Sequence, residues 1–325
     1  MMIDNVINGR YVIGSPSGTF DEKPRAARQP GKLSHRGDWA ADIARVGDTL
    51  VFGASLRGSM HYGLGTVRQD SFAIGSESGS SERQWIIAAI ADGVSSAEQA
   101  HTFADYMARQ TVIIVADALS SREPEPDTLR DIDWDSTARR LVSVSEEFCR
   151  NAARRTVDQS KASEVDKASP GDFAQKWATT LEFVAIQINS ADSSPGNERA
   201  LNKEYAHVTV AGDGAAYLLN KSAGWTVIKR GKSQSGALAS NAVLSLPLEP
   251  EAFAVSFGYL KDDDCLLLTT DGLGDFIGDG NTPLGEFLSR KLPECVSLAS
   301  FLQVVDVSLY QADDDRTLIM IKGTG

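Results

Sequence analysis

The sequence has little cysteine, a deficit of basic residues and no long apolar run, and each shortage excludes a class of protein. Its 325 residues include three cysteines, Cys149, Cys265 and Cys295, whose spacing suggests neither a zinc site nor a redox motif. Lysine and arginine number 32 against 44 acidic residues, a formal net charge of −12. This balance argues against nucleic acid or an anionic membrane as a partner, because phosphate contacts need clustered basic side chains.

The sequence also shows no pattern typical of a targeting signal or of a membrane-spanning segment. No apolar run approaches the length of a membrane-spanning helix, and the N-terminus lacks the charged segment, apolar core and cleavage site of a secretory signal. Few cysteines in a long chain are typical of a reducing compartment. We therefore expect a cytoplasmic protein that is neither secreted nor embedded in a membrane.

Apolar residues make up 42% of the chain, which is enough for a large core. Residues 1–45 are rich in Gly, Pro and polar residues, so we expect an extension that is loosely ordered or packed on one domain formed by 46–325. Periodicity predicts strands at 49–55, 71–74, 85–91, 177–188, 205–212, 215–219, 225–229 and from 317, and helices from 97, over 134–152, and near 283–292 and 297–309. Residues 157–171 and 231–262 resemble loops. Strands that bunch in this way favour a mainly antiparallel, layered α+β fold.

The stretch 85–96 is the strongest single signal. Its apolar run ends abruptly in Asp92-Gly93 and then turns polar, which is typical of a buried strand that delivers a carboxylate to the end of a sheet. Ser95 and Glu98 have capping-box spacing, which predicts that a helix begins there. A strand, an acidic turn and a helix in this order indicate a functional site.

The same pattern recurs at Asp271-Gly272 after 265–270 and, more weakly, at Asp213-Gly214 after 208–212. A further acidic cluster, 313–315, precedes the predicted last strand. If these strands lie side by side, several carboxylates meet at one edge. Crowded carboxylates repel one another, and a divalent cation with oxygen ligands is the usual way to hold them together.

Six motifs recur in a characteristic order: Gln69-Asp70-Ser71-Phe72, Ala91-Asp92-Gly93, Ala178-Thr179-Thr180, Gly212-Asp213-Gly214-Ala215-Ala216-Tyr217, Thr270-Asp271-Gly272-Leu273-Gly274-Asp275 and Asp314-Asp315-Arg316-Thr317. Together they resemble the metal-dependent type 2C serine/threonine protein phosphatases over about 50–323. The stretch from Gly58 through His61 and Gly65 to Gln69-Asp70 is similar to the bacterial branch of that family. The resemblance implies an α+β fold, a four-layer αββα sandwich whose two antiparallel sheets are flanked by helices, with a metal site at one edge.

The resemblance also implies metal ligands. Asp92 would bridge two Mn²⁺ or Mg²⁺ ions, and the carbonyl of Gly93 would bind the second ion. Asp271 and Asp314 would hold the first ion. Two hard cations with oxygen ligands suit hydrolysis of a phosphate ester, because they generate hydroxide from water near neutral pH and clamp the phosphoryl group.

Three further residues complete the implied site. Asp70 and Asp275 would order metal-bound water, which makes them part of the metal set. His61 is a candidate catalytic residue that contacts the phosphate or water, and its alternative is a loop histidine with a local partner. No covalent phosphoenzyme is needed by this mechanism.

The sequence departs from the family pattern at several positions. Gln69 stands where Glu is usual, Gly65 where many members have a phosphate-binding Arg, and Val94 where some have a proton-donating His. The nearest basic candidates for phosphate capture are Arg57, His61 and Arg68. These departures predict weak binding of the second ion. The leaving group would take its proton from metal-bound water, or turnover would be slower.

Plainer interpretations compete for the same residues. Most Asp-Gly pairs satisfy their own turn, Asp70 can be an ordinary strand-edge residue, Asp275 can cap a turn, and an acidic turn such as 313–315 can simply be solvated. Asp213 is more often a structural hydrogen-bonding residue, and Gly214 and Ala215 replace the Ser and Arg usual after it.

We therefore expect a monomeric phosphoprotein phosphatase that acts on phosphoserine or phosphothreonine and opposes a Ser/Thr kinase. Two alternatives stay open. One is a binding or scaffold protein of the same fold that is catalytically weak or inactive, as the three departures suggest. The other is a metal-dependent hydrolase of small phosphate esters.

Overall fold

Two antiparallel β-sheets pack face to face in the computed structural model, which describes residues 5–7, 10–13, 36–79, 83–120, 128–157, 162–188, 202–221, 224–231, 244–248, 250, 253–309 and 313–323. In this part of the chain, one sheet has the order β10-β9-β12-β14-β4-β3 and the other β11-β8-β7-β6-β5. The first sheet contains β3 (Trp39–Val46), β4 (Thr49–Leu56), β9 (Ala215–Asn220), β10 (Gly224–Lys229), β12 (Cys265–Thr269) and β14 (Arg316–Gly323). The second contains β5 (Ser71–Ser78), β6 (Gln84–Ala91), β7 (Leu181–Ile188), β8 (Asn202–Ala211) and β11 (Ala254–Lys261).

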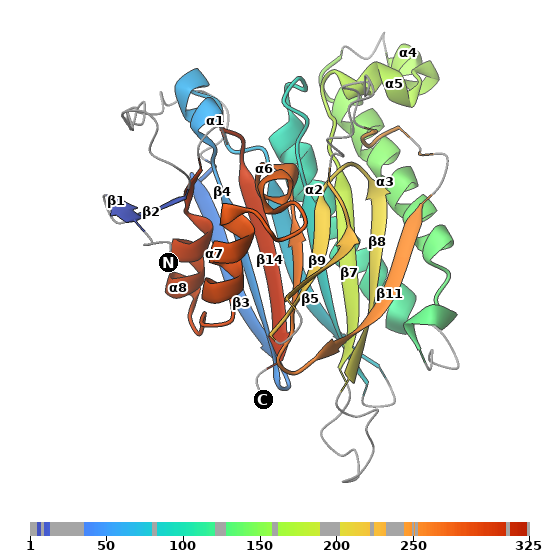
Figure 1. The fold of residues 1–325 in the computed structure, drawn as a ribbon. Coiled ribbons are helices and arrows are strands. Elements are labelled where there is room, and N and C mark those ends of the chain that lie inside the picture. Colours follow the sequence, from blue (N-terminus) through green and yellow to red (C-terminus); the bar gives the residue numbers. More distant parts are fainter. Residues whose placement is uncertain are drawn as a thin grey trace.

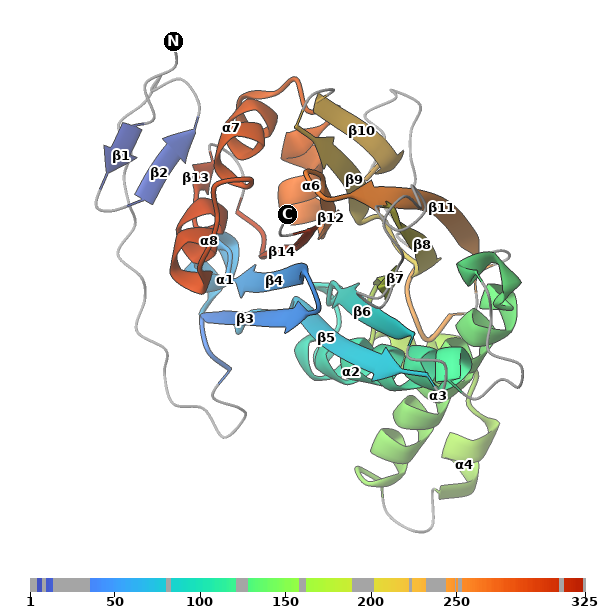
Figure 2. The same ribbon diagram turned by 90° about the horizontal axis from the view of Figure 1, so that it is seen from below.

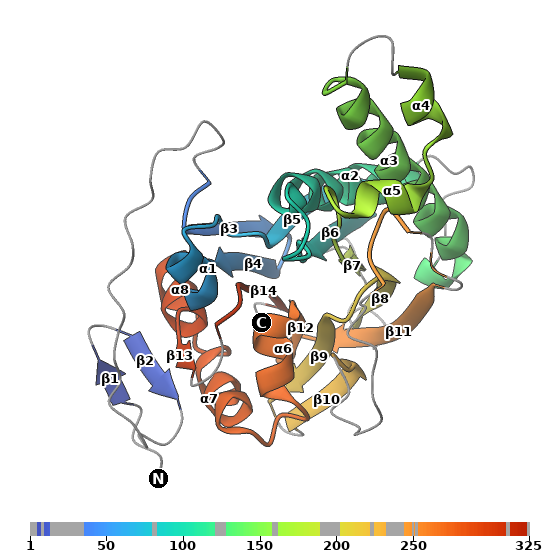
Figure 3. The same cartoon turned by 90° about the horizontal axis from the view of Figure 1, so that it is seen from above.

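Helices cover the outer face of each sheet (Figure 1). The two long helices α2 (Ala100–Ser120) and α3 (Trp134–Arg154) lie over the five-stranded sheet, and α6 (Asp271–Ile277), α7 (Pro283–Lys291) and α8 (Leu298–Val305) lie over the six-stranded sheet. Figures 2 and 3 look along the strands and show the helices outside and the sheets inside. The predicted four-layer αββα sandwich is confirmed.

Smaller elements complete the fold. They are α1 (Ser59–Leu64), a 3₁₀ turn at Leu129–Asp131, α4 (Ala162–Lys167), α5 (Pro170–Ala174), and a small sheet of β1 (Asn5–Ile7), β2 (Arg10–Ile13) and β13 (Ser308–Leu309). No helix in the described part of the chain is long and apolar enough to cross a membrane.

Strand β6 shows why the central strands are so apolar. Ile86 and Ile90 point into the layer between the sheets, where they pack with residues such as Ile319 of the other sheet. Trp85 and Ile87 point the other way, onto the face covered by α2 and α3. Because both faces are covered, the strand has no polar alternation, and its end carries Asp92 to the edge of the sheet.

Helix α2 begins at Ala100, so the predicted start near Ser95 is wrong. The backbone N–H groups of Val94, Glu98 and Gln99 donate to carbonyl groups in 175–178, at 3.0, 3.3 and 2.8 Å respectively. These bonds to a distant segment hold the chain in turns for several residues. Tertiary hydrogen bonds therefore override the local capping signal.

Three other segments differ from the prediction. The expected loop 157–171 contains α4 and the start of α5, and the expected loop 231–262 contains β11, although 232–243 lie outside the described residues. All but the last residue of strand β3 lies within 1–45, where we expected an extension, and the strand pairs along its length with β4. The residues 14–35 of that extension also lie outside the described residues. Both β3 and β11 are edge strands with half-exposed, mixed sequences, which give a weak strand signal.

Candidate functional site

Strand pairing brings Asp70 and Asp92 to the same edge of the five-stranded sheet. In the antiparallel pair β5–β6, Ser71 lies opposite Ala91. Asp70 directly precedes the first of these strands and Asp92 directly follows the second, so the two residues are neighbours across the pair. Their closeness follows from the register and could not be read from a separation of 22 positions in sequence.

The six-stranded sheet brings Asp271 and Asp314 together in the same way. Strand β12 ends at Thr269, which lies opposite Leu318 near the start of β14. Asp271 opens α6 just after β12, and Asp314 lies just before β14. The backbone N–H of Thr270 also donates to the Thr317 carbonyl at 3.2 Å, which continues the pairing toward the acidic residues.

Asp70 links the ends of the two sheets. Its Oδ2 accepts hydrogen bonds from Oγ1 of Thr270 at 2.7 Å and from Oγ1 of Thr317 at 2.8 Å, and both threonines belong to the other sheet's edge. The side chain is buried. Burial, followed by the negative charge of Asp315, raises the pKa of Asp70 to about 7.

Asp92 lies among the other carboxylates. Its backbone N–H donates to Thr180 Oγ1 at 2.9 Å, and its carbonyl accepts from the Thr180 N–H at 2.8 Å. Burial, followed by the charges of Asp70, Asp271 and Asp314, raises the pKa of Asp92 well above its ordinary value. The structure therefore brings these four predicted residues into one electrostatic neighbourhood, in which each charge disfavours the next.

His61 lies in α1 and contacts the acidic residues before β14. Its Nδ1 is 2.7 Å from Oγ1 of Thr66, and its Nε2 is 3.4 Å from Oδ1 of Asp314 and 3.8 Å from Oδ2 of Asp315. Burial lowers the pKa of His61, but the hydrogen bond to Asp314 and the charge of Asp315 outweigh it and raise the pKa. The ring therefore has a local partner in Thr66 and lies within ion-pair distance of Asp314.

Asp315 is a site residue that the sequence prediction missed. Its Oδ1 accepts from the Gly58 N–H at 2.6 Å, and its Oδ2 accepts from the N–H groups of Gln69 and Asp70. A Cβ at Gly58 would lie 2.2 Å from the Asp314 carbonyl carbon, so only glycine fits there. Three consecutive Asp residues give no local signal that separates the buried one from its neighbours.

Gly93 and Asp275 complete the predicted metal set. Gly93 is buried, and a Cβ on it would lie 2.9 Å from the Gln69 carbonyl oxygen, so this turn requires glycine. Asp275 lies one turn after Asp271 on α6 and is exposed. A Cβ at Gly231 would lie 2.8 Å from its Oδ1, which places Asp275 at the side of the site nearest β10.

A sequence model of the family described as protein phosphatase 2C matches residues 57–303. The chain belongs to the protein phosphatase 2C family. The crystal structure of the serine/threonine phosphatase Stp1 from Staphylococcus aureus has the same fold, with a TM-score of 0.50 and 10% identity over 90% of this chain and 100% of that chain. No curated protein sequence matches the chain significantly.

Two other solved structures are similar to the chain. PppA, a regulatory component of T6SS in Pseudomonas aeruginosa, has 18% identity and a TM-score of 0.49 over 86% of this chain and 99% of that chain. The catalytic domain of PstP in complex with two manganese ions has 18% identity and a TM-score of 0.48 over 85% of this chain and 99% of that chain.

The departure at Gly65 from the phosphatase 2C pattern has a structural reason. Gly65 ends α1 in the left-handed region, with φ 68°, and its N–H caps the carbonyls of His61 and Tyr62. An arginine there would be strained whatever the surrounding space. The arginine expected by family resemblance is therefore replaced by a residue that the local helix end requires.

This backbone requirement predicts opposite effects for two neighbouring glycines. Gly65→Ala should lower the free energy of unfolding by about 1 kcal/mol, because alanine disfavours a positive φ. Gly63→Ala should raise it by about 0.5 to 1 kcal/mol, because Gly63 is helical and a Cβ there meets no atom within 4 Å. Urea unfolding measures both, and a Gly65→Ala variant as stable as wild type would contradict the assigned conformation.

The two arginines nearest the site in sequence, Arg57 and Arg68, bind neighbouring groups of the protein. Arg57 pairs with Asp38 at 3.2 Å, donates to the His61 carbonyl at 2.7 Å and lies over the ring of Tyr62. Arg68 donates to Ser55 Oγ and to the Asp70 carbonyl. Burial lowers the pKa of Arg68 to about 10. Both guanidinium groups are already engaged with the protein, so phosphate capture by either would require rearrangement.

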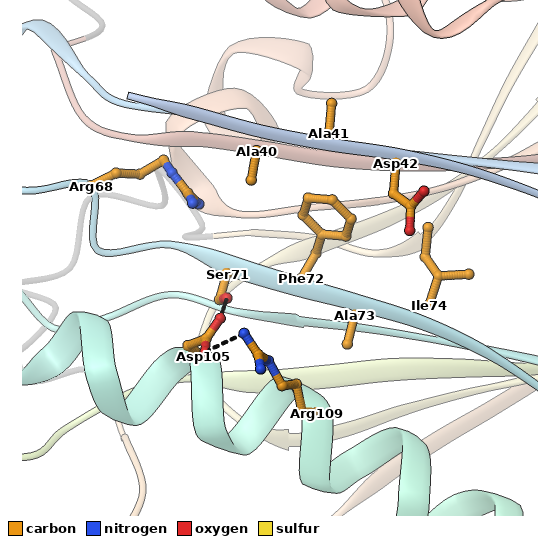
Figure 4. Close-up of a pocket in the computed structure, with 10 residues that line it drawn as sticks. All are labelled: Ala40, Ala41, Asp42, Arg68, Ser71, Phe72, Ala73, Ile74, Asp105 and Arg109. Carbon is orange, nitrogen blue, oxygen red and sulfur yellow. Dashed lines mark hydrogen bonds and ion pairs between the residues drawn. The ribbon is translucent and has the colours of Figure 1, made fainter. Parts of the chain in front are cut away.

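A cavity of about 300 Å³ opens beside the carboxylates between the edge strands β3 and β5 (Figure 4). Arg68 and Ser71 lie at one end of it. Asp105 of α2 accepts from Ser71 Oγ at 3.2 Å and pairs with Arg109 at 2.8 Å. The predicted metal residues do not line this cavity, so it borders the site without containing it.

The residues at the site fit hard divalent cations. Within the described residues, no three His, Cys, Asp or Glu side chains already form an ion-binding cluster. However, Gln69 Oε1 is buried and has no hydrogen-bond partner in the described part of the chain. The other oxygen atoms that could bind a metal here belong to the predicted carboxylates and to the Gly93 carbonyl. An all-oxygen set of ligands of this kind suits Mg²⁺ or Mn²⁺. A cation would relieve the repulsion between carboxylates, which adds to burial in raising the pKa of Asp92.

Proposed function

We propose that this member of the family is a metal-dependent protein phosphatase that hydrolyses phosphoserine and phosphothreonine. The observation that carries the proposal is the meeting of Asp70, Asp92, Asp271 and Asp314 at the adjoining ends of both sheets, where burial, followed by the charges of the other three, raises the pKa of Asp92. Two Mn²⁺ or Mg²⁺ ions, when bound, supply Lewis acidity and a water-derived nucleophile.

The chain's own residues divide into ligands and orienting groups. Asp92 would bridge the two ions, Gly93 would offer its carbonyl to one, and Asp271 and Asp314 would hold the other. The position of Asp92 is fixed by its two backbone hydrogen bonds to Thr180. These bonds support a bridge role because they tie the main chain at Asp92 to the residue that directly precedes β7.

The remaining predicted residues would orient water or a metal ligand. They are Asp70, Asp275 and His61. Asp70 is held by two threonine hydroxyls and would order water in the site, and Asp275 would do so from α6. His61 contacts Asp314 through Nε2 and sets the direction of that carboxylate. We further propose that this phosphatase is a cytoplasmic monomer that opposes a Ser/Thr kinase. The three free, buried cysteine thiols support the reducing compartment in this proposal.

Purified protein should hydrolyse an aryl phosphate and a phosphothreonine peptide when Mn²⁺ or Mg²⁺ is present, and a chelator should abolish turnover. The expected rates are measured by phosphate release with and without metal. Nucleotides and sugar phosphates serve as comparison substrates, and preference for these would indicate a small-ester hydrolase. Metal-loaded protein without turnover of any of these esters would refute the enzymatic proposal.

A second candidate function is phosphopeptide binding without catalysis. Gly65 favours it, because the helix end at this position leaves no place for the arginine that many relatives have. Val94 likewise offers no proton to a leaving group. Calorimetry separates the two candidates, because tight phosphopeptide binding without phosphate release supports the scaffold and release of phosphate excludes it.

A further inference from the structure

A buried ionic cluster joins the two sheets. Glu182 of β7 and His207 of β8 are each only 1% exposed, and His207 Nε2 lies 3.1 Å from Glu182 Oε2. Lys229 of β10, in the other sheet, donates to Glu182 Oε1. Burial alone would raise the pKa of Glu182, but the bonds to His207 and Lys229 outweigh it and lower the pKa, so the carboxylate stays charged. The proposed chemistry gives none of the three a role.

Lys229 also holds the turn between β8 and β9. Its Nζ donates to the Gly214 carbonyl at 2.7 Å and to the Gly212 carbonyl at 3.3 Å. A Cβ at Gly214 would lie 2.8 Å from Glu182 Oε1. Glycine, in place of the family's usual serine, therefore leaves room for the Glu182 carboxylate beside the turn.

The turn at 212–214 packs against Thr180, the residue that holds Asp92. Gly212 has φ 110°, and a Cβ on it would lie 2.3 Å from the Cβ of Thr180. Thr180 accepts from the Asp92 N–H through Oγ1 at 2.9 Å and donates its own N–H to the Asp92 carbonyl at 2.8 Å. A continuous series of contacts therefore runs from the Lys229 ammonium to the backbone of Asp92.

We propose that Glu182, His207 and Lys229 are positioning residues that press the 212–214 turn against Thr180 and thereby fix Asp92 for binding of Mn²⁺ or Mg²⁺. The effect on metal affinity rests on the proposed function, whereas the effect on the backbone of Asp92 does not. Ligand positions must be held to about 0.5 Å for a tight site. A cluster that contacts both sheets can hold ligand positions in this way, because the proposed ligands Asp92 and Asp271 come from different sheets.

The test is Lys229→Met, which keeps the length of the side chain and removes its donors. We expect Mn²⁺ affinity, measured by calorimetry, to fall about 10-fold or more. We also expect amide hydrogen exchange of the metal-free protein to accelerate at Asp92 and Thr180. The control is Lys221→Met, on the hairpin between β9 and β10, whose pair with Asp263 is exposed and 3.5 Å long. That variant should change neither measurement.

The double variant Glu182→Gln/Lys229→Met separates positioning from stability. It removes the buried charge of Glu182 together with that of its partner Lys229, so it should fold even if the single variant does not. Stability near wild type with weak metal binding and fast exchange at Asp92 supports the proposal. Recovery of affinity and slow exchange in the double variant would overturn it. If wild type binds no Mn²⁺, the proposed function fails, and exchange alone decides: unchanged exchange at Asp92 and Thr180 overturns the positioning role, and faster exchange supports it.

Discussion

Asp92→Asn is expected to abolish metal-dependent turnover and, at the same time, to make the metal-free protein more stable. Asp92 is the proposed bridge, so its loss should weaken metal binding by more than about 100-fold, beyond the 10- to 100-fold typical of residues that only support a ligand. The stability gain comes from the crowding of Asp92 with Asp70, Asp271 and Asp314, which together with burial raises its pKa.

The sign of the stability effect follows from proton linkage. A carboxyl with a raised pKa in the folded state stabilises the fold below its unfolded pKa, and that contribution is lost as pH rises through the folded pKa. Near neutral pH, wild type must therefore either take up a proton on folding or hold a repelled charge at Asp92. Asparagine requires neither, so Tm should rise by a few degrees at pH 7 to 8, and the difference should shrink as pH falls toward about 4.

Calorimetric Mn²⁺ titration and thermal melts with and without metal check this prediction. Mn²⁺ should raise the Tm of wild type and leave Asp92→Asn unchanged, because only a ligand that binds the folded state stabilises it. Asp135→Asn is the matched control, since Asp135 is exposed on α3 and pairs only at the surface with Arg139. A variant at Asp92 that retained nearly normal rate would show that another residue is the bridge.

The sequence allowed Asp92 to be placed because β6 is covered on both faces. Ile86 and Ile90 face the other sheet while Trp85 and Ile87 face the helices, so the strand is an unbroken apolar run whose end is visible without a structure. Asp271 was predictable for the same reason, since it follows β12, which is buried throughout. The buried central strands therefore predicted the positions of these two carboxylates, whereas the four-layer sandwich was implied by the family resemblance.

Features that depend on distant contacts could not be predicted. Strand β3 has one open edge and alternates poorly, so it was assigned to the extension. The start of α2 is set by bonds from Glu98 and Gln99 to a segment about 77 positions later, which no local capping rule contains. The cluster of Glu182, His207 and Lys229 likewise requires the register of β7 with β8 and the packing of β10 against them.

Asp315→Ala is expected to lower the free energy of unfolding by about 3 kcal/mol, because it leaves buried N–H groups of Gly58 and Gln69 without acceptors. Burial raises the pKa of Asp315, so removal of the charge offsets part of this loss. The hydrogen bonds dominate, since each unsatisfied buried donor costs about 1 to 3 kcal/mol. Urea unfolding of the metal-free protein measures the change without any contribution from metal binding.

The three consecutive aspartates should then separate into three different phenotypes. Asp313→Ala, at an exposed position, should stay within about 0.5 kcal/mol of wild type. Asp314→Ala should keep most of the stability and lose metal-dependent turnover, because its side chain is 40% exposed and belongs to the proposed ligand set. Asp315→Ala alone should destabilise the fold, because its carboxylate ties the loop before α1 to the residue before Asp70. Equal stability losses at 313 and 315 would mean that the charge of the cluster matters rather than the backbone bonds of one member.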